Sequence, residues 1–166
     1  MQESERKAVG ISVTKLIVSI FICEAIGGIG SIFTIGAVST WYVSLQKPWF
    51  TPPNWLFGPV WLTLFLLMGL CLYLIWIHPD NRSIRQKAFI AFGVQLALNV
   101  LWTFLFFGLQ QFLGGLIEIL VLWVVIALTI VESYRVRKAA GLLLIPYIAW
   151  VTVATLLNYY VWLLNP

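Results

Sequence analysis

Charged side chains are scarce in this sequence. Only 10% of the 166 residues are Asp, Glu, Lys or Arg, whereas 61% are hydrophobic. A soluble domain usually carries roughly 25% charged residues, which form most of its polar surface. The composition therefore indicates an integral membrane protein rather than a soluble one.

Residue types that build common reactive sites are also few. The chain has one histidine, His78, and two cysteines, Cys23 and Cys71, both within apolar runs. The cysteine spacing fits neither a disulfide framework nor a zinc site. The histidine has no suitable serine and acidic neighbours for a hydrolytic triad, and the sequence contains no glycine-rich phosphate loop. The sequence therefore predicts no conventional hydrolase or transferase, no cofactor and no metal site.

Long apolar runs dominate the chain instead. A helix needs about 20 apolar residues to cross roughly 30 Å of hydrocarbon. The sequence predicts an all-α membrane protein whose five transmembrane helices form one domain over residues 1–166. The expected spans are residues 13–37, 55–77, 88–108, 112–133 and 139–163. Short connections predict antiparallel neighbours in one bundle, and Pro146 predicts a bend in the fifth span.

Basic residues are divided unevenly between the two ends of these spans. Of the ten Lys and Arg residues, only Lys47 falls on the side of the loop between the first two spans. The positive-inside rule then predicts a cytoplasmic N-terminus and an external C-terminus. Because the basic residues lie at the ends of apolar segments, the net charge of +4 is explained by topology, and no nucleic-acid partner is expected. The expected partner is the lipid bilayer.

The stretch from Trp41 to Trp61 is rich in tryptophan and proline. It contains Pro48, Pro52, Pro53 and Pro59, each of which fixes φ and removes a backbone donor. Most of the stretch is therefore expected to be stiff and non-helical, with the loop at residues 38–54 forming the lid of a cavity. The alternative interpretation is an aromatic belt at headgroup depth.

Two acidic residues lie inside the predicted spans. Glu24 is in the first span and Glu118 in the fourth, where an ionised carboxylate is costly. Both are expected to face the bundle interior, either as structural hydrogen-bonding groups or as proton or ligand sites. Gly27 and Ser31 form a small-xxx-small pair that lets another helix approach the first span closely.

Polar and aromatic residues share single faces of two other spans. Helical spacing places Gln95, Asn99, Trp102 and Phe106 on one face of the third span, and Tyr147, Trp150, Ala154 and Asn158 on one face of the fifth. Buried amides need partners where water is absent. These faces indicate either interhelical hydrogen bonds or a cavity with aromatic walls.

Several motifs together resemble those of a known membrane protein family. They are Trp41-Tyr42 to Lys47-Pro48, Thr51-Pro52-Pro53 to Trp61, Leu98-Asn99 to Trp102 with Phe106-Phe107-Gly108, Glu118, Pro146-Tyr147 to Trp150, and Leu157-Asn158-Tyr159. The chain resembles the TspO/translocator proteins, also called tryptophan-rich sensory proteins or peripheral-type benzodiazepine receptors. The resemblance implies a five-helix bundle, commonly a homodimer, with a cavity under the first long loop that binds porphyrins such as protoporphyrin IX, or haem.

The resemblance also implies which residues contact the ligand. Matched by motif, the ligand-binding set is Trp41, Tyr42, Trp61, Asn99, Trp102, Trp150 and Ala154, to which we add Tyr147 from the same face of the fifth span. Trp61 and Trp150 match the pair that bacterial members use for light-dependent porphyrin breakdown, which makes them the candidate catalytic residues. Leu163 stands where the sterol-recognition pattern of animal members needs a basic residue. This departure argues against sterol binding and favours a microbial origin.

Three functions from different classes fit these observations. The first is a membrane tetrapyrrole-binding protein that acts in porphyrin sensing, transport or light-dependent degradation. The second is a small passive or proton-coupled carrier for an amphipathic solute, with Glu24 and Glu118 as its protonatable groups. The third is a dimeric regulatory module whose interface lies around Gly27 and Ser31.

Overall fold

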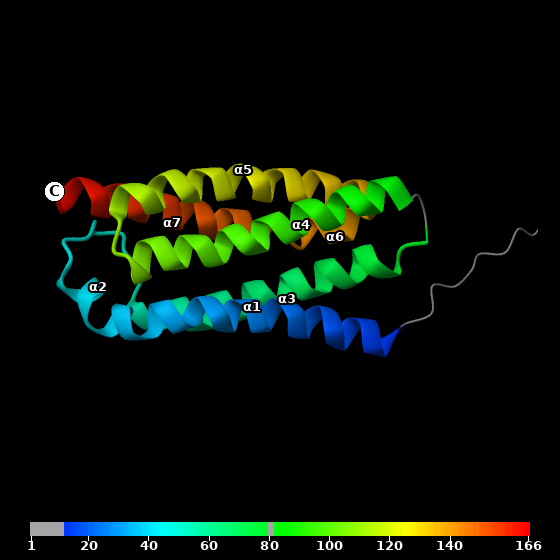
Figure 1. Cartoon of the computed structure of the whole chain (residues 1–166), viewed down its shortest axis with the longest axis horizontal. Helices are drawn as coiled ribbons and strands as arrows, with labels where there is room; N and C mark the ends of the chain where they lie inside the picture. Colours follow the sequence, from blue (N-terminus) through cyan, green and yellow to red (C-terminus); the bar gives the residue numbers. More distant parts are fainter. Residues whose placement is uncertain (1–11, 80–81) are drawn as a thin grey trace, which may run out of the picture.

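A computed structural model of the chain describes residues 12–79 and 82–166. This part of the chain is built from helices and contains no β-strand. In chain order the elements are α1 (Val13–Ser39), α2 (Trp41–Ser44), α3 (Asn54–Ile77), α4 (Arg82–Thr103), the π-helix η1 (Phe104–Gly108), α5 (Phe112–Val136), α6 (Lys138–Leu142) and α7 (Ile145–Leu164) (Figure 1).

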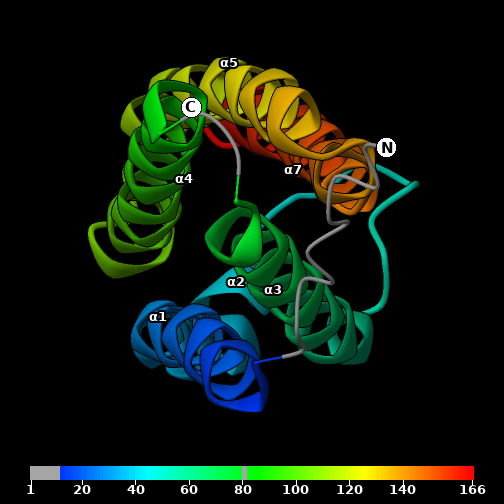
Figure 2. The ribbon, with the colours of Figure 1, turned by 90° about the vertical axis from the view of Figure 1, so that its right-hand side faces the viewer.

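The prediction of five membrane-crossing helices is confirmed. Within the described residues, five helical segments are long and apolar enough to cross a bilayer: α1, α3, α4 with η1, α5, and α6 with α7. Viewed from one end, α1 packs on α3, and α5 lies between α4 and α7 (Figure 2). The short connections make sequence neighbours antiparallel, as expected.

The basic residues gather at one end of the bundle. Lys15 lies in the first turn of α1, Arg82 begins α4, and Arg135 and Lys138 flank the junction of α5 and α6. The first two helices are joined at the opposite end, where Lys47 lies (Figure 1). The chain therefore has one basic end, as its charge pattern predicts, although Arg6 and Lys7 lie outside the described residues.

The fifth span is broken rather than bent. Helix α6 ends at Leu142, and α7 begins at Ile145 with Pro146 in its first turn. A proline is well tolerated there because the first amides of a helix have no intrahelical partner. The predicted bend at Pro146 is thus a short interruption that separates α6 from α7.

The proline-rich loop is shorter than its sequence suggests. Helix α1 continues to Ser39, the four residues of α2 follow at Trp41–Ser44, and α3 starts at Asn54 and contains Pro59. The expected loop at residues 38–54 is therefore corrected to a non-helical segment at residues 45–53. Pro59 lies inside α3, as the sixth residue of the helix, where it has no N–H to donate to the Trp55 carbonyl.

Helices α1 and α3 approach each other closely through two glycines. A Cβ atom on Gly69 would lie 2.7 Å from the Cα atom of Ile20, and one on Gly27 would lie 2.5 Å from the Phe65 ring. Such distances are available only to a residue without a side chain. The close approach that Gly27 predicts is therefore made to α3 of the same chain.

Candidate functional site

A cavity of about 450 Å³ lies between α1, α3 and α4, toward the end of the bundle that carries the loop. Helix α1 lines it from Glu24 to Ser39, α3 from Asn54 to Phe65, and α4 with η1 from Asn99 to Phe107. Ile35 and Leu62 are exposed members of the lining, with exposed fractions of 73% and 63%. The cavity therefore opens at the molecular surface beside α1 and α3.

The walls of this cavity carry five aromatic rings. These are the rings of Trp61, Phe57, Phe65, Trp102 and Phe107. The Trp61 and Phe65 rings are 5.7 Å apart and tilted, whereas the Trp102 and Phe107 rings meet edge to face at 5.8 Å. Rings on three different elements thus surround one space. Such a space is suited to a flat, largely apolar ligand, because ring faces stack well on aromatic molecules.

Hydrogen bonds fix the polar wall formed by α4. The Asn99 amide nitrogen donates to the Tyr147 hydroxyl at 3.0 Å, and the Trp102 indole N–H donates to Asn158 Oδ1 at 3.2 Å. Asn158 donates in turn to the Phe112 carbonyl at 2.9 Å. The Trp102 indole N–H and one of the two Asn99 amide N–H groups are therefore engaged, so these residues can offer a ligand an amide oxygen and an indole face.

The hydroxyl groups of the cavity wall are bonded to their own helices. Ser31 Oγ donates to the Gly28 carbonyl at 2.7 Å, Thr34 Oγ1 to the Gly30 carbonyl at 2.9 Å, and Thr103 Oγ1 to the Val100 carbonyl at 2.7 Å. Their oxygen lone pairs stay available as acceptors. Together with the Asn99 oxygen, these groups give the cavity a wall of hydrogen-bond acceptors.

The sequence-predicted ligand residues divide into two groups. Trp61, Asn99 and Trp102 line the cavity, whereas Trp41, Tyr42, Tyr147, Trp150 and Ala154 do not belong to its lining. Tyr42 lies behind the wall and packs on two rings that form it. Its ring centroid is 6.2 Å from that of Phe57 and 5.8 Å from that of Phe107. Tyr147 and Ala154 are buried in α7. Most of this second group therefore supports the wall from behind.

Trp41 packs behind the cavity wall, where its ring meets that of Phe107 edge to face at 6.4 Å. Its ring stacks on Phe112 at 5.7 Å, with 11° between the planes, and meets Phe106 edge to face at 5.8 Å. This aromatic cluster holds the start of the loop against η1 and α5. Trp41 therefore positions the loop.

Trp150 lines a different hollow from its expected partner Trp61. It belongs to an apolar groove of about 470 Å³ between α3 and α7, with Val60, Thr63 and Pro146 among the other lining residues. Its indole N–H is buried and has no hydrogen-bond partner in the described part of the chain. Phe57 connects the two hollows, because it lines the cavity and meets the Trp150 ring edge to face at 5.7 Å.

The two intramembrane acids also occupy different positions. Glu24 is half-buried and lines the cavity. Glu118 has an exposed fraction of 6%, and neither of its carboxyl oxygens has a hydrogen-bond partner among residues 12–79 and 82–166. Glu118 is buried in the bundle interior, as predicted from the cost of exposing a carboxyl group to hydrocarbon. Glu24 instead lines the cavity that opens at the surface, so only Glu24 can touch a molecule there.

The loop at residues 45–53 is anchored to the end of α7. The Gln46 backbone N–H donates to Asn165 Oδ1 at 3.0 Å, and Asn165 Nδ2 donates to the Gln46 carbonyl at 3.0 Å. The Phe50 ring also meets Tyr160 edge to face at 5.5 Å. These contacts carry the loop across the bundle from α1 toward α7 (Figure 1).

Lys47 closes the first part of the loop on itself. Its ammonium group donates to the Tyr42 carbonyl at 2.7 Å and lies 4.6 Å from the centre of the Tyr42 ring. Burial raises the pKa of Tyr42 to about 12, so its ring stays neutral and electron-rich near pH 7. A cation over such a ring is stabilised, which keeps this part of the loop compact.

We expect the change Asn165→Ala to release the loop. It removes both hydrogen bonds to Gln46, each contributing roughly 1 kcal/mol, so amide exchange at Gln46 should become about tenfold faster. Hydrogen exchange read by mass spectrometry over residues 45–53 measures this change. Gln46→Ala is a matched control, because Asn165 contacts only the backbone of Gln46. Equal exchange in Asn165→Ala and the wild type would contradict the anchoring role.

Sequence reasoning missed part of the cavity wall. Phe57 and Phe65 belong to a helical stripe that is usually ordinary packing, and Thr34 and Thr103 were not singled out. A signal for Thr103 was present, since it follows Asn99 by four residues and thus continues the same face of α4. For Thr34, only the packing of α1 on α3 reveals that it faces the cavity.

The fold defines a multi-pass integral membrane protein, with a cavity between α1, α3 and α4 that is lined in part by aromatic rings. Comparison with known proteins identifies the family: the TspO/MBR family model matches residues 19–163. The chain belongs to the TspO/MBR family.

Named relatives span archaea, bacteria and animals. The chain is 48% identical to the tryptophan-rich protein TspO of Archaeoglobus fulgidus over 155 residues, which cover 93% of this chain and 99% of the relative. It is 39% identical to the protein CrtK of Rhodobacter capsulatus, with 94% and 96% covered. It is 42% identical to the human translocator protein, with 81% and 80% covered.

Proposed function

We propose that this protein binds a planar tetrapyrrole of the porphyrin or haem type within the membrane, for sensing, transport or light-dependent degradation. The observation that carries the proposal is the aromatic cavity between α1, α3 and α4. Its volume of about 450 Å³ falls within the usual range for small-molecule sites, roughly 300–1,000 Å³.

The chemistry of the cavity matches such a ligand. A tetrapyrrole has a wide aromatic face, and the indoles of Trp61 and Trp102 come from different helices on the cavity wall. Offset or edge-to-face contacts between such rings add about 1 kcal/mol each to the burial of apolar area. The amide oxygen of Asn99 supplies an acceptor near the middle of the bundle.

Quenching of tryptophan fluorescence by protoporphyrin IX, titrated into the detergent-purified protein in the dark, tests the proposal. We expect saturable quenching at micromolar concentrations, because Trp61 and Trp102 line the cavity. Trp49 is 96% exposed, so the variant Trp49→Phe removes a source of non-specific quenching and serves as the background protein. Quenching that rises without saturation in a folded sample would contradict a porphyrin site.

Illumination of the same samples tests the degradation activity. We expect light-dependent loss of porphyrin absorbance in the wild type and none in the double variant Trp61→Phe, Trp150→Phe. Of the single variants, Trp61→Phe should slow the decay more, because Trp61 touches the cavity whereas Phe57 separates Trp150 from it. Trp55→Phe is the control, since this exposed residue lines none of the three hollows described for this chain. Unchanged decay in the double variant would remove the catalytic role but leave binding intact.

We also propose that the basic end of the bundle faces the cytoplasm of a microbial cell. The uneven charge supports this orientation, because short loops rich in Lys and Arg are retained on the cytoplasmic side. The cavity and the loop at residues 45–53 would then lie toward the external side.

A further inference from the structure

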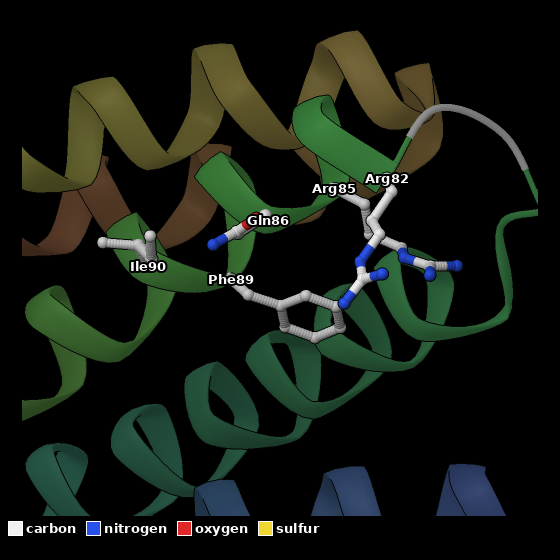
Figure 3. A pocket seen from close by; sticks show the side chains of 5 residues that line it. All are labelled: Arg82, Arg85, Gln86, Phe89 and Ile90. Carbon is white, nitrogen blue, oxygen red and sulfur yellow. The ribbon is translucent and has the colours of Figure 1, made fainter.

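A second hollow lies at the basic end of the bundle, away from the aromatic cavity. Its volume is about 380 Å³, and its lining residues all belong to the first turns of α4: Arg82, Arg85, Gln86, Phe89 and Ile90. In Figure 3 the two arginine side chains and the Phe89 ring project to the same side of α4. We call this site the basic-end hollow.

The lining changes from charged to apolar along the helix. Arg82, Arg85, Gln86 and Phe89 are spaced at i, i+3, i+4 and i+7, which places them along one face of α4. Ile90 lies about 12 Å further along the helix axis than Arg82 at 1.5 Å per residue, and it is 58% exposed. A bilayer shows the same order over a similar depth, from the charged headgroups to the first methylenes of the acyl chains.

The two guanidinium groups retain donors for an anion. Arg85 Nη1 donates to the His78 carbonyl at 2.7 Å, which uses one of the five N–H groups that a guanidinium offers. Arg82 is exposed. Within residues 12–79 and 82–166, neither arginine forms a salt bridge with a carboxylate. The ion pair found in these ranges joins Arg135 to Glu132. The positive charges of Arg82 and Arg85 are therefore not neutralised by a carboxylate of the described residues.

We propose that the basic-end hollow is a binding site for an anionic phospholipid, such as a phosphatidylglycerol. Arg82, Arg85 and the Gln86 amide contact the phosphate, and the first acyl methylenes pack on Phe89 and Ile90. Basic pockets at the ends of transmembrane helices recognise anionic headgroups in this manner. A free phosphate ion would contact the arginines but not the apolar floor of the hollow, which is formed by Phe89 and Ile90. A phospholipid contacts both parts, so the apolar floor favours a lipid over a free phosphate ion.

Native mass spectrometry in mixed micelles of phosphatidylglycerol and phosphatidylcholine tests this site. We expect wild-type protein to retain phosphatidylglycerol in preference to phosphatidylcholine. Arg82→Gln should weaken phosphatidylglycerol binding about fivefold, since one basic group near an anionic surface contributes about 1 kcal/mol. Arg82→Lys keeps the charge and should retain most of the binding. Ile90→Ser should also weaken it, because the apolar floor is lost.

Arg137→Gln is the matched control, because Arg137 is an exposed arginine at the same end of the bundle but outside the hollow. It should leave the preference unchanged. An equal loss in Arg82→Gln and Arg137→Gln would overturn the proposal in favour of general charge attraction. Full displacement of the lipid by inorganic phosphate would overturn the lipid assignment. Unchanged melting temperatures show that each variant is folded, and unchanged lipid retention by folded Arg82→Gln would rule out the site.

Discussion

The variant Thr34→Phe should bind porphyrin at least about tenfold more weakly than the wild type, while its helical bundle stays folded. Thr34 lines the cavity from α1, and its hydroxyl donates to the Gly30 carbonyl in its own helix. The new ring fills space that the ligand needs, so the bound ligand and the ring overpack the cavity. Overpacking costs about 1–3 kcal/mol, and a loss of that size in binding free energy is equivalent to roughly a tenfold to hundredfold loss of affinity. Quenching of tryptophan fluorescence by protoporphyrin IX measures this loss. Phenylalanine is the chosen replacement because it adds no new tryptophan to the signal.

Thr63→Phe provides the matched control for this change. Thr63 is also a helical threonine whose hydroxyl bonds to a carbonyl four residues earlier, that of Pro59, but it lines the groove that contains Trp150. We expect porphyrin binding to be unchanged in this variant. The reverse result, with weaker binding in Thr63→Phe and normal binding in Thr34→Phe, would move the ligand to the groove between α3 and α7.

Gly69→Ala should destabilise the bundle by about 2 kcal/mol or more. The added Cβ atom would lie 2.7 Å from the Cα atom and 3.2 Å from the backbone nitrogen of Ile20, so relief requires α1 to move away from α3. Overpacking of this kind typically costs about 1–3 kcal/mol, and a backbone contact cannot be relieved by a change of rotamer. Thermal unfolding in detergent, followed by circular dichroism, measures the loss. Porphyrin binding should weaken as well, because α1 and α3 form two walls of the cavity.

Gly93→Ala is the control for Gly69→Ala. Gly93 lies within α4, and a Cβ atom there would have no neighbour among the described residues within 4 Å. Alanine is favoured over glycine in a helix by up to about 1 kcal/mol, so stability should be unchanged or slightly higher. Comparable melting temperatures for both variants would show that α1 and α3 do not need their close contact.

The five spans were predictable because each one is a long apolar run bounded by charged, polar or proline-rich segments. The ends of α1 and α2 were not predictable, because Ser39 and Trp41 have no nearby residue that stops a helix, and the first proline of the loop is Pro48. The break before α7 was expected only as a bend. Proline marks where a helix is interrupted, but the packing of the neighbouring helices decides how far the chain departs from helical geometry.

The candidate site was predictable in part. Asn99 and Trp102 line the cavity as the periodicity of the third span predicts, because an amide beside an aromatic ring is unusual in an apolar helix. Trp150 lies in a separate groove because the rotation of α7 relative to α3 depends on tertiary packing. The wall contributed by α1 required the structure, since Thr34 and Ser31 resemble ordinary small residues of a transmembrane helix.

The anchoring of Gln46 by Asn165 has a practical consequence for labelling this protein. Any polypeptide that continues past Pro166 would emerge beside the loop at the cavity end of the bundle. A bulky fluorescent protein or affinity tag attached there would compete with Asn165 for space near Gln46 and would alter the ligand measurements described above. A small dye at the same place would instead report on the surroundings of the loop.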